Sequence, residues 1–295
     1  MATLREVRAR IIGVKTTQKI TRAMKMVAAA KLRRAQAGVV AARPYSHKMK
    51  DLLDHLVESS DTSLNSLVSP RETRSVAFVV VTSDRGLCGA FNSNLLRAAV
   101  EHVDKHYAAE NESGNLKVFC VGRKGFDFFS KRHYKVVGKH IGVYNNLVFA
   151  QARMIARELV DGYMKEEFDK VKVIYNEFKS VAQQRIVIDQ FLPVSVSSGD
   201  VNAAKRSVHY IYEPNPIAIV NALIPKHLDF QMWRILLESN ASEQGARMAA
   251  MDNATENANE MISMLQLAYN KARQGSITKE LLEVVGGAEA LNKTG

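Results

Sequence analysis

The feature that most constrains the fold is a long apolar seam in the C-terminal part of the chain. No proline follows Pro225, and apolar side chains then recur at intervals of three and four residues over positions 230–272, with one early repeat of four. A spacing held near 3.5 residues over about six heptads predicts a long helix that winds around a partner in a left-handed coiled coil. The seam positions are Phe230, Trp233, Leu237, Ala241, Gln244, Met248, Met251, Thr255, Ala258, Ile262, Leu265, Tyr269 and Ala272.

The N-terminal segment, residues 2–57, carries a matching helical pattern. Its first apolar residues follow a 3-4-3 spacing, which places them on one helix face. Ala28, Ala29 and Ala30 are strong helix formers with very small side chains. Gly38 and Pro44 predict a bend in this helix. Each terminal helix must bury its seam, so the simplest arrangement pairs the two helices antiparallel.

Positive charge is concentrated in this N-terminal segment. The whole chain carries a formal net charge of +11, yet residues 1–50 hold 13 Lys/Arg and a single acid, Glu6. The other 245 residues are almost neutral, with 28 Lys/Arg against 29 Asp/Glu. Such a basic block predicts an acidic partner: nucleic acid, anionic lipid or an acidic protein surface.

The middle of the chain alternates short β-branched runs with helical stretches. Alternation of this kind predicts a mostly parallel α/β sheet. The fold class is therefore α/β with a long α-helical coiled coil, in which the terminal helices form an antiparallel coiled coil around an inserted Rossmann-like domain. The predicted domains are residues 1–58, 74–195 and 205–295. The predicted strands are Val76–Val81, Leu116–Val121, 171–175, 185–191 and 208–212, and the predicted helices are 94–107, 124–131 and 147–168.

Motifs for catalysis or for cofactor binding are weak throughout. The Gly-rich stretch 82–92 follows a strand, but it matches neither GxxxxGK[ST] nor GxGxxG, so a tight turn is the preferred interpretation. His102 and His106 have the i, i+4 spacing of a metal pair without a third ligand. Cys88 and Cys120 form no CxxC and favour small buried side chains. No catalytic residue, cofactor site or metal site is predicted.

Three motifs together resemble one family. The stretches QKITRAMKMVAAAK (18–31), TSDRGLCGAFN (82–92) and ITKELLEVVGGAEA (277–290) resemble the gamma subunit of F-type ATP synthases, and they lie at both ends and in the middle of the chain. The resemblance implies a non-catalytic rotor shaft. Rotation of a membrane c ring, driven by ions, would turn this shaft inside a ring of alpha and beta subunits, with an epsilon subunit alongside. The resemblance is to bacterial and mitochondrial chains alike. A bacterial source is favoured, which implies the cytoplasmic side of a bacterial inner membrane; the alternative is the matrix side of a mitochondrial inner membrane.

The same resemblance implies roles for individual residues. Met24 and Lys25, Arg247, and the pair Arg273 and Gln274 match family positions that contact the beta subunit. Two further residues match the foot that contacts the c ring, namely Tyr210 and Glu213.

Two other functions remain open from the residues alone. The basic N-terminal block is also typical of a nucleic-acid-binding coiled-coil protein, although no aromatic residue precedes Tyr45. An α/β nucleotide-binding enzyme with helical extensions is a third interpretation, which the missing phosphate-binding lysine disfavours. Specific nucleic-acid binding is not predicted.

Overall fold

The computed structural model describes residues 3–59, 65–181, 183–195, 213 and 215–293. The chain divides into two compact units. The first, here called the terminal unit, comprises Met1–Val27 and Met248–Gly295; the second, the sheet unit, comprises Ala28–Arg247. Two long helices run through both: α1 (Leu4–Ser59) has 56 residues and α6 (Pro216–Lys293) has 78. The predicted division at residues 58, 74, 195 and 205 stays a prediction.

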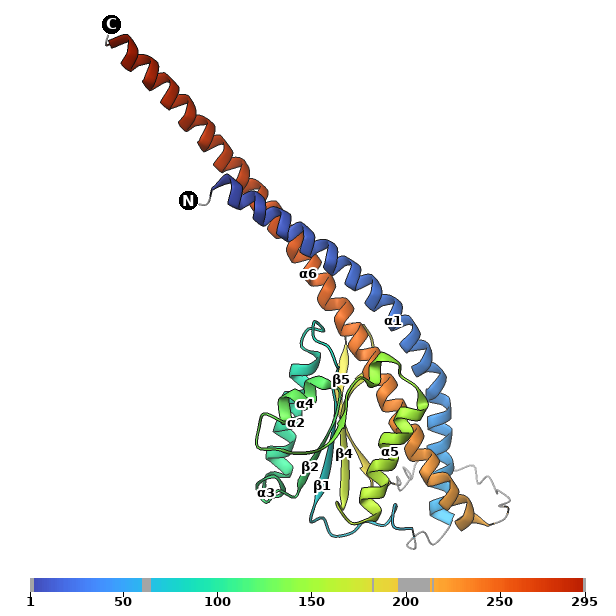
Figure 1. The fold of residues 1–295 in the computed structure, drawn as a ribbon. Coiled ribbons are helices and arrows are strands. Elements are labelled where there is room, and N and C mark those ends of the chain that lie inside the picture. Colours follow the sequence, from blue (N-terminus) through green and yellow to red (C-terminus); the bar gives the residue numbers. More distant parts are fainter. Residues whose placement is uncertain (1–2, 60–64, 182, 196–212, 214, 294–295) are drawn as a thin grey trace. The chain divides into compact units, whose positions relative to one another are not determined.

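In the terminal unit, α1 and α6 form an antiparallel pair (Figure 1). Gln18 bonds to Asn259, the hydroxyls of Thr21 and Thr255 lie 2.7 Å apart, and Lys25 pairs with Asp252. Partner numbers fall as the α1 numbers rise, which confirms the predicted antiparallel arrangement.

The apolar seam of α6 is confirmed by its burial. Met251 and Ala258 are buried, and the seam positions from Ile262 to Ala272 are half-buried, while most residues between them are exposed. Thr21 of α1 is only 8% exposed and faces the polar seam position Thr255. A polar pair inside an apolar seam fixes the register, because any shift would leave both hydroxyls facing apolar neighbours.

A five-stranded sheet forms the centre of the sheet unit, in the order β3-β2-β1-β4-β5. β1 pairs parallel with β2 and β4, β2 pairs parallel with β3, and β5 runs antiparallel to β4. All six residues of β1 are buried, as expected for a central strand covered on both faces. The strands are β1 (Val76–Val81), β2 (Leu116–Val121), β3 (Lys135–His140), β4 (Lys170–Phe178) and β5 (Gln184–Leu192).

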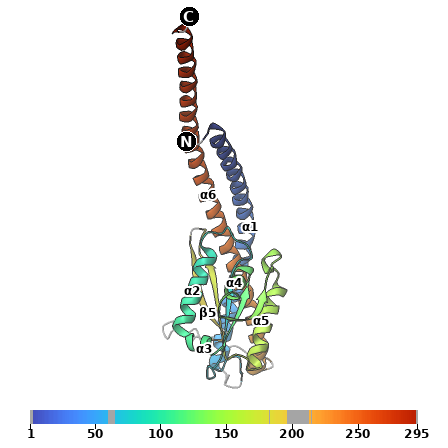
Figure 2. The same ribbon diagram turned by 60° about the vertical axis from the view of Figure 1, so that its left-hand side comes forward.

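Helices cover both faces of this sheet (Figure 2). One face packs against α2 (Phe91–His106) and α4 (Arg123–Phe129) through Phe78, Leu95 and Phe129. The other face packs against α5 (Phe149–Met164) and against parts of α1 and α6. Two short elements complete the unit, α3 (Ala108–Glu112) and the 3-10 turn η2 (Val143–Asn145).

One stretch of α6 is enclosed on nearly all sides within the sheet unit. Ten of its residues between Ile235 and Gly245 are buried, Asn240 being half-buried. The buried polar groups there have partners: Glu238 accepts hydrogen bonds from the Phe178 amide (3.0 Å) and from Arg43, and Ser242 donates to the Asn176 carbonyl (3.1 Å). Burial of these groups is tolerable only because they are bonded. They join α6 to the end of β4.

Three sequence expectations need correction. β3 was not predicted, because KVVGKH is an edge strand with exposed lysines rather than an apolar run. The last helix begins at Pro216 rather than after Pro225: Asn215 caps it by accepting a hydrogen bond from the Ala218 amide (2.8 Å), and proline suits the first helical position. Pro225 lies inside the helix between Ile224 and Leu228, both fully buried, so packing outweighs the lost hydrogen bond.

The third correction concerns the interruption expected at Gly38 and Pro44: α1 continues through both positions, and the predicted bend stays a prediction. A Cβ built on Gly38 would lie 3.2 Å from Cδ2 of Leu237. Glycine therefore serves close approach of α1 to α6 rather than a break. The strand predicted at 208–212 lies outside the described residues.

Candidate functional site

Met24 and Lys25 lie on α1 where it pairs with α6 in the terminal unit. Met24 is half-buried. The Lys25 side chain is 39% exposed and forms an ion pair with Asp252, itself 54% exposed. An exposed pair of this kind is weak, so the ammonium group can exchange Asp252 for another carboxylate. Asp252 and Asn259, which bond to α1, were not predicted, whereas Thr255 was a predicted seam position; the spacing of three and four residues from Thr255 was the available signal.

Most other cations of α1 face solvent. Two cations of this helix form ion pairs with α6, Lys25 with Asp252 and Arg43 with Glu238. The basic block is therefore largely free of internal partners. The exposed cations are Arg5, Arg8, Arg10, Lys15, Lys19, Arg22, Lys31, Arg33, Arg34 and Lys48.

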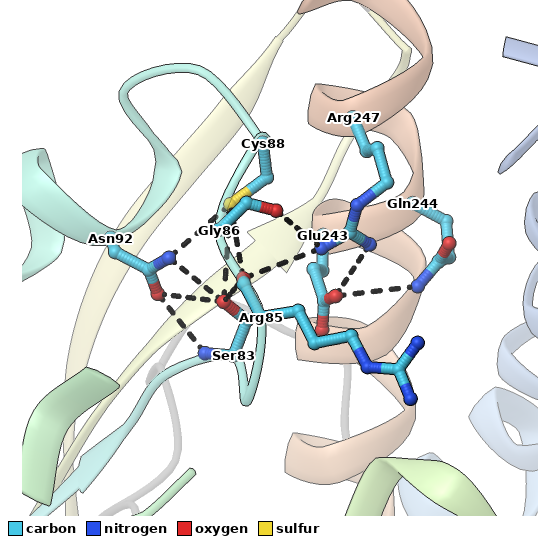
Figure 3. Close-up of polar contacts among 8 residues, drawn as sticks. All are labelled: Ser83, Arg85, Gly86, Cys88, Asn92, Glu243, Gln244 and Arg247. Carbon is cyan, nitrogen blue, oxygen red and sulfur yellow. Dashed lines mark hydrogen bonds and ion pairs between the residues drawn. The ribbon is translucent and has the colours of Figure 1, made fainter. Parts of the chain in front are cut away.

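The Gly-rich stretch 82–92 forms a closely bonded turn between β1 and α2. Ser83 donates to the Arg85 carbonyl (2.7 Å), and the Asn92 side chain accepts from the Ser83 amide (3.0 Å) and donates to the Ser83 hydroxyl (2.8 Å) (Figure 3). Leu87 has a positive φ of 62° and is 65% exposed. The left-handed conformation is costly for leucine, so the surrounding bonds must hold it in place.

Arg247 fastens this turn to α6. Its guanidinium donates to the carbonyls of Gly86 (3.2 Å) and Arg85 (3.4 Å) and pairs with Glu243 (2.6 Å), as Figure 3 shows. The Arg247 side chain is only 12% exposed. Burial raises the pKa of the Glu243 carboxyl, an effect that the adjacent Arg247 opposes. In the chain by itself, Arg247 thus serves contacts within the sheet unit.

At the carboxyl ends of the parallel strands, the helix amides that could bind a phosphate already donate hydrogen bonds within the chain. The first three amides of α4 donate to the turn after β1: Arg123 to the Asp84 carboxylate (3.0 Å), Lys124 to the Ser83 carbonyl (3.1 Å) and Gly125 to the Thr82 hydroxyl (2.8 Å). Helix N-termini attract anions through such amides. Here the anion is Asp84, which also accepts from the Gly142 amide. This geometry agrees with a structural turn rather than a phosphate loop.

Two further residues predicted to contact the beta subunit lie on an exposed part of α6. Arg273 and Gln274 are exposed on α6, beside the half-buried Ala272. Beyond Ser276 every described side chain through 288 is exposed, because the antiparallel register brings the start of α1 opposite the region of Ala272. The exposed segment includes large apolar residues, namely Ile277, Leu281, Leu282, Val284 and Val285.

The two predicted foot residues have different outcomes. Glu213 is exposed. Tyr210 lies outside the described residues, so its placement stays a prediction.

The histidines and cysteines form no ligand set in the described parts of the chain. The rings of His102 and His106 lie 4.6 Å apart, and burial lowers the pKa of His102. Both cysteines are buried and free, and burial raises the pKa of Cys120 to about 12. A thiol with such a pKa is unreactive at neutral pH.

Comparisons with known proteins give one consistent result. A family model described as ATP synthase matches residues 3–291. The ATP synthase gamma chain of Chloroherpeton thalassium is 52% identical over 100% of both chains, and that of Chlorobaculum tepidum is 51% identical over 99% of this chain and 100% of the relative.

Solved structures agree on the fold. A chain in the central stalk and c-ring structure of the Tetrahymena thermophila mitochondrial ATP synthase is similar with a TM-score of 0.60 and 25% identity, over 80% of this chain and 99% of that one. A chain of the Euglena gracilis mitochondrial ATP synthase gives a TM-score of 0.68 at 21% identity, over 98% and 94% of the two chains. No described helix combines the length and apolarity needed to cross a bilayer.

Proposed function

The chain belongs to the gamma-chain family of ATP synthases, and we propose that it is the central rotor shaft of an F-type ATP synthase. In this role it couples ion-driven rotation of a membrane c ring to conformational cycling of a catalytic alpha/beta ring. Bond chemistry takes place in the head, and this chain is a non-catalytic subunit. It associates with the membrane peripherally, through the complex, on the cytoplasmic side of a bacterial inner membrane.

The observation that carries this proposal is the exposed surface of the terminal unit. A helical pair that needed no partner would cover its apolar side chains, yet among the described side chains of α6 beyond Ser276 five large apolar ones are exposed. The free cations of α1 are equally suited to acidic loops of a surrounding ring. Because most of these cations lack fixed internal partners, their attraction to the ring changes gradually with angle, which suits rotation.

Individual contacts follow from the family positions. Met24 and Lys25 face an acidic hinge region of the beta subunit, and Lys25 exchanges Asp252 for an acid of that subunit. Arg273 and Gln274, exposed at the end of the paired region, form a catch on the beta subunit. Arg247 contacts the beta subunit only after giving up part of its bonding to the 82–92 turn. Tyr210 and Glu213 contact the c ring, and an epsilon subunit lies alongside.

Co-purification tests the proposal directly. The tagged chain is purified from its native membranes, and ATPase activity is measured on the eluate and on the isolated chain. We expect alpha- and beta-sized partners and activity that the isolated chain lacks. Recovery of the chain alone, or with nucleic acid, would contradict the shaft function.

A further inference from the structure

A second basic surface lies on the sheet unit, on α4 and β3. Between residues 123 and 139 the only acid is Asp127. Within the described parts of the chain, none of the six cations in this stretch has an ion-pair partner, in contrast to Lys25 or Arg43. The near-neutral charge of residues 51–295 conceals this local excess. The basic face consists of the exposed residues Arg123, Lys124, Lys131, Arg132, Lys135 and Lys139.

An apolar groove adjoins the basic face between α2 and α4. Its volume is about 410 Å³, and it is lined by Leu96, Val100 and Phe128 together with the exposed Ser93, Arg97 and Glu101. The groove and the basic face are continuous, because the Arg132 guanidinium lies 3.6 Å from the centre of the Phe128 ring.

Two aromatic rings of this surface, Phe126 and Phe128, each already carry a cation on one face. Arg132 covers Phe128, and the Lys139 ammonium lies 4.3 Å from the centre of the Phe126 ring. Single-stranded nucleic acid binds by stacking on open rings, and the cations on these two rings compete with such stacking. A flat anionic membrane would meet the cations but would not fill a groove.

We propose that this face docks an amphipathic, acidic helix of another polypeptide. Apolar side chains of the helix occupy the groove between α2 and α4, and its carboxylates lie over the cations of α4 and β3. An amphipathic helix in a hydrophobic groove is a common mode of recognition, and the surrounding charge selects an acidic partner.

Edge protection explains only part of the basic face. Lys135 and Lys139 lie on the edge strand β3, which also carries an irregularity in its pairing with β2. Lysines and bulges on an edge strand discourage pairing with other strands. Lys124, Lys131 and Arg132 lie off that strand and have no such role, so a docking function accounts for more of the surface.

Zero-length carbodiimide cross-linking of the assembled complex tests the proposal. Because this experiment uses the complex, the docking proposal rests on the proposed function. The reagent joins a lysine amine to a carboxylate in direct contact, and digestion with mass spectrometry identifies both. We expect Lys124, Lys131 or Lys135 to be joined to Asp or Glu residues of one helical segment of another polypeptide. Cross-links from Lys19 or Lys31 to the head report separately on the shaft function.

The overturning result is equally definite. If amine-reactive labelling of these three lysines is the same in the complex and in the isolated chain, and no cross-link forms, the surface is not a docking site. Protection that needs added anionic vesicles or nucleic acid would assign the face to those partners instead.

Two kinds of variant test the contribution of the cations and that of the apolar groove separately. The cross-link yield of Lys124 should fall by about tenfold in the double variant Lys131→Glu with Lys135→Glu. The control is the double variant Lys165→Glu with Lys226→Glu, which makes an equal charge change at exposed positions elsewhere and should leave that yield unchanged. Val100→Trp fills the groove without altering charge and should lower the yield similarly. An unaltered yield in Val100→Trp would overturn the helix-in-groove proposal.

Discussion

At the scale of single residues, the exposed pair Arg273 and Gln274 is where a rotating contact is most accessible to test. We expect Arg273→Ala with Gln274→Ala to slow ATP turnover in the assembled complex without preventing assembly. The contact proposed for this pair is charge-assisted, would contribute about 1–3 kcal/mol, and would form only at some rotary angles. Lys279→Ala, an exposed cation on the same helix, is the matched control. Equal turnover in the double variant and the parent would remove the pair from the mechanism.

Asp169 links the stability of the sheet unit to pH. Burial works to raise the pKa of its carboxyl. Hydrogen bonds from the Arg74 and Ser75 amides, together with the positive charge of Arg71 in an ion pair at 2.9 Å, outweigh burial and lower that pKa. A lowered native pKa contributes stability above the unfolded-state pKa, and this is lost as pH falls through the native value. We expect Asp169→Asn to flatten the acid limb of the stability–pH curve, measured by urea unfolding. An unchanged limb would show that other carboxyls dominate.

At the scale of helices, the contact of α1 with α6 depends on small residues at defined places. Gly38→Leu should destabilise the chain by about 1–3 kcal/mol, because Leu237 already lies 3.2 Å from where a Cβ would be. Gly13 lies in the same helix with nothing within 4 Å, so Gly13→Leu should be neutral or slightly stabilising. Denaturant unfolding compares the two variants, and equal effects would refute the role of close approach.

A second contact between α1 and α6 is made by the buried Glu238. It is 1% exposed and joins Arg43 of α1 to the end of β4. Glu238→Gln replaces charge-assisted bonds with weaker neutral ones and should cost about 1–3 kcal/mol. Glu283→Gln, which breaks the exposed pair with Lys279, should cost less than about 0.5 kcal/mol. Thermal unfolding of both variants checks the difference, and a smaller loss in Glu238→Gln would contradict the assignment.

How far the sequence predicts these elements depends on how each is stabilised. The buried strands β1 and β2 have the predicted bounds because their apolar runs need no partner to be recognised. β3 depends on pairing with β2, and the first turns of α6 depend on burial of Val220 and Ile224, so local pattern alone does not reveal either. The Asn215 cap and Pro216 were available as a start signal.

The candidate site follows the same division. Exposure of the α1 cations and of Arg273 could be predicted from helical periodicity. The bonds of Arg247 to the 82–92 turn and of Arg43 to Glu238 could not, because 161 and 195 residues separate the partners. Such contacts are set by the fold as a whole.

At the scale of the whole molecule, the exposed end of α6 should be dispensable for folding. Removing residues 277–295 deletes a segment whose described side chains are exposed, so the unfolding midpoint should remain unchanged. A truncation that begins at Tyr269 also removes half-buried seam residues and should lower the midpoint. Circular dichroism melts of the two truncations provide the comparison, and an equal fall in both would show that the exposed end supports the fold.

The occupied amides of α4 have a consequence for control of the machine. Asp84 accepts hydrogen bonds from the Arg123 and Gly142 amides, and its negative charge would repel a phosphate group at this helix start. Because the first three amides of α4 are already bonded within the chain, we expect this turn to keep one arrangement whether or not nucleotides are present.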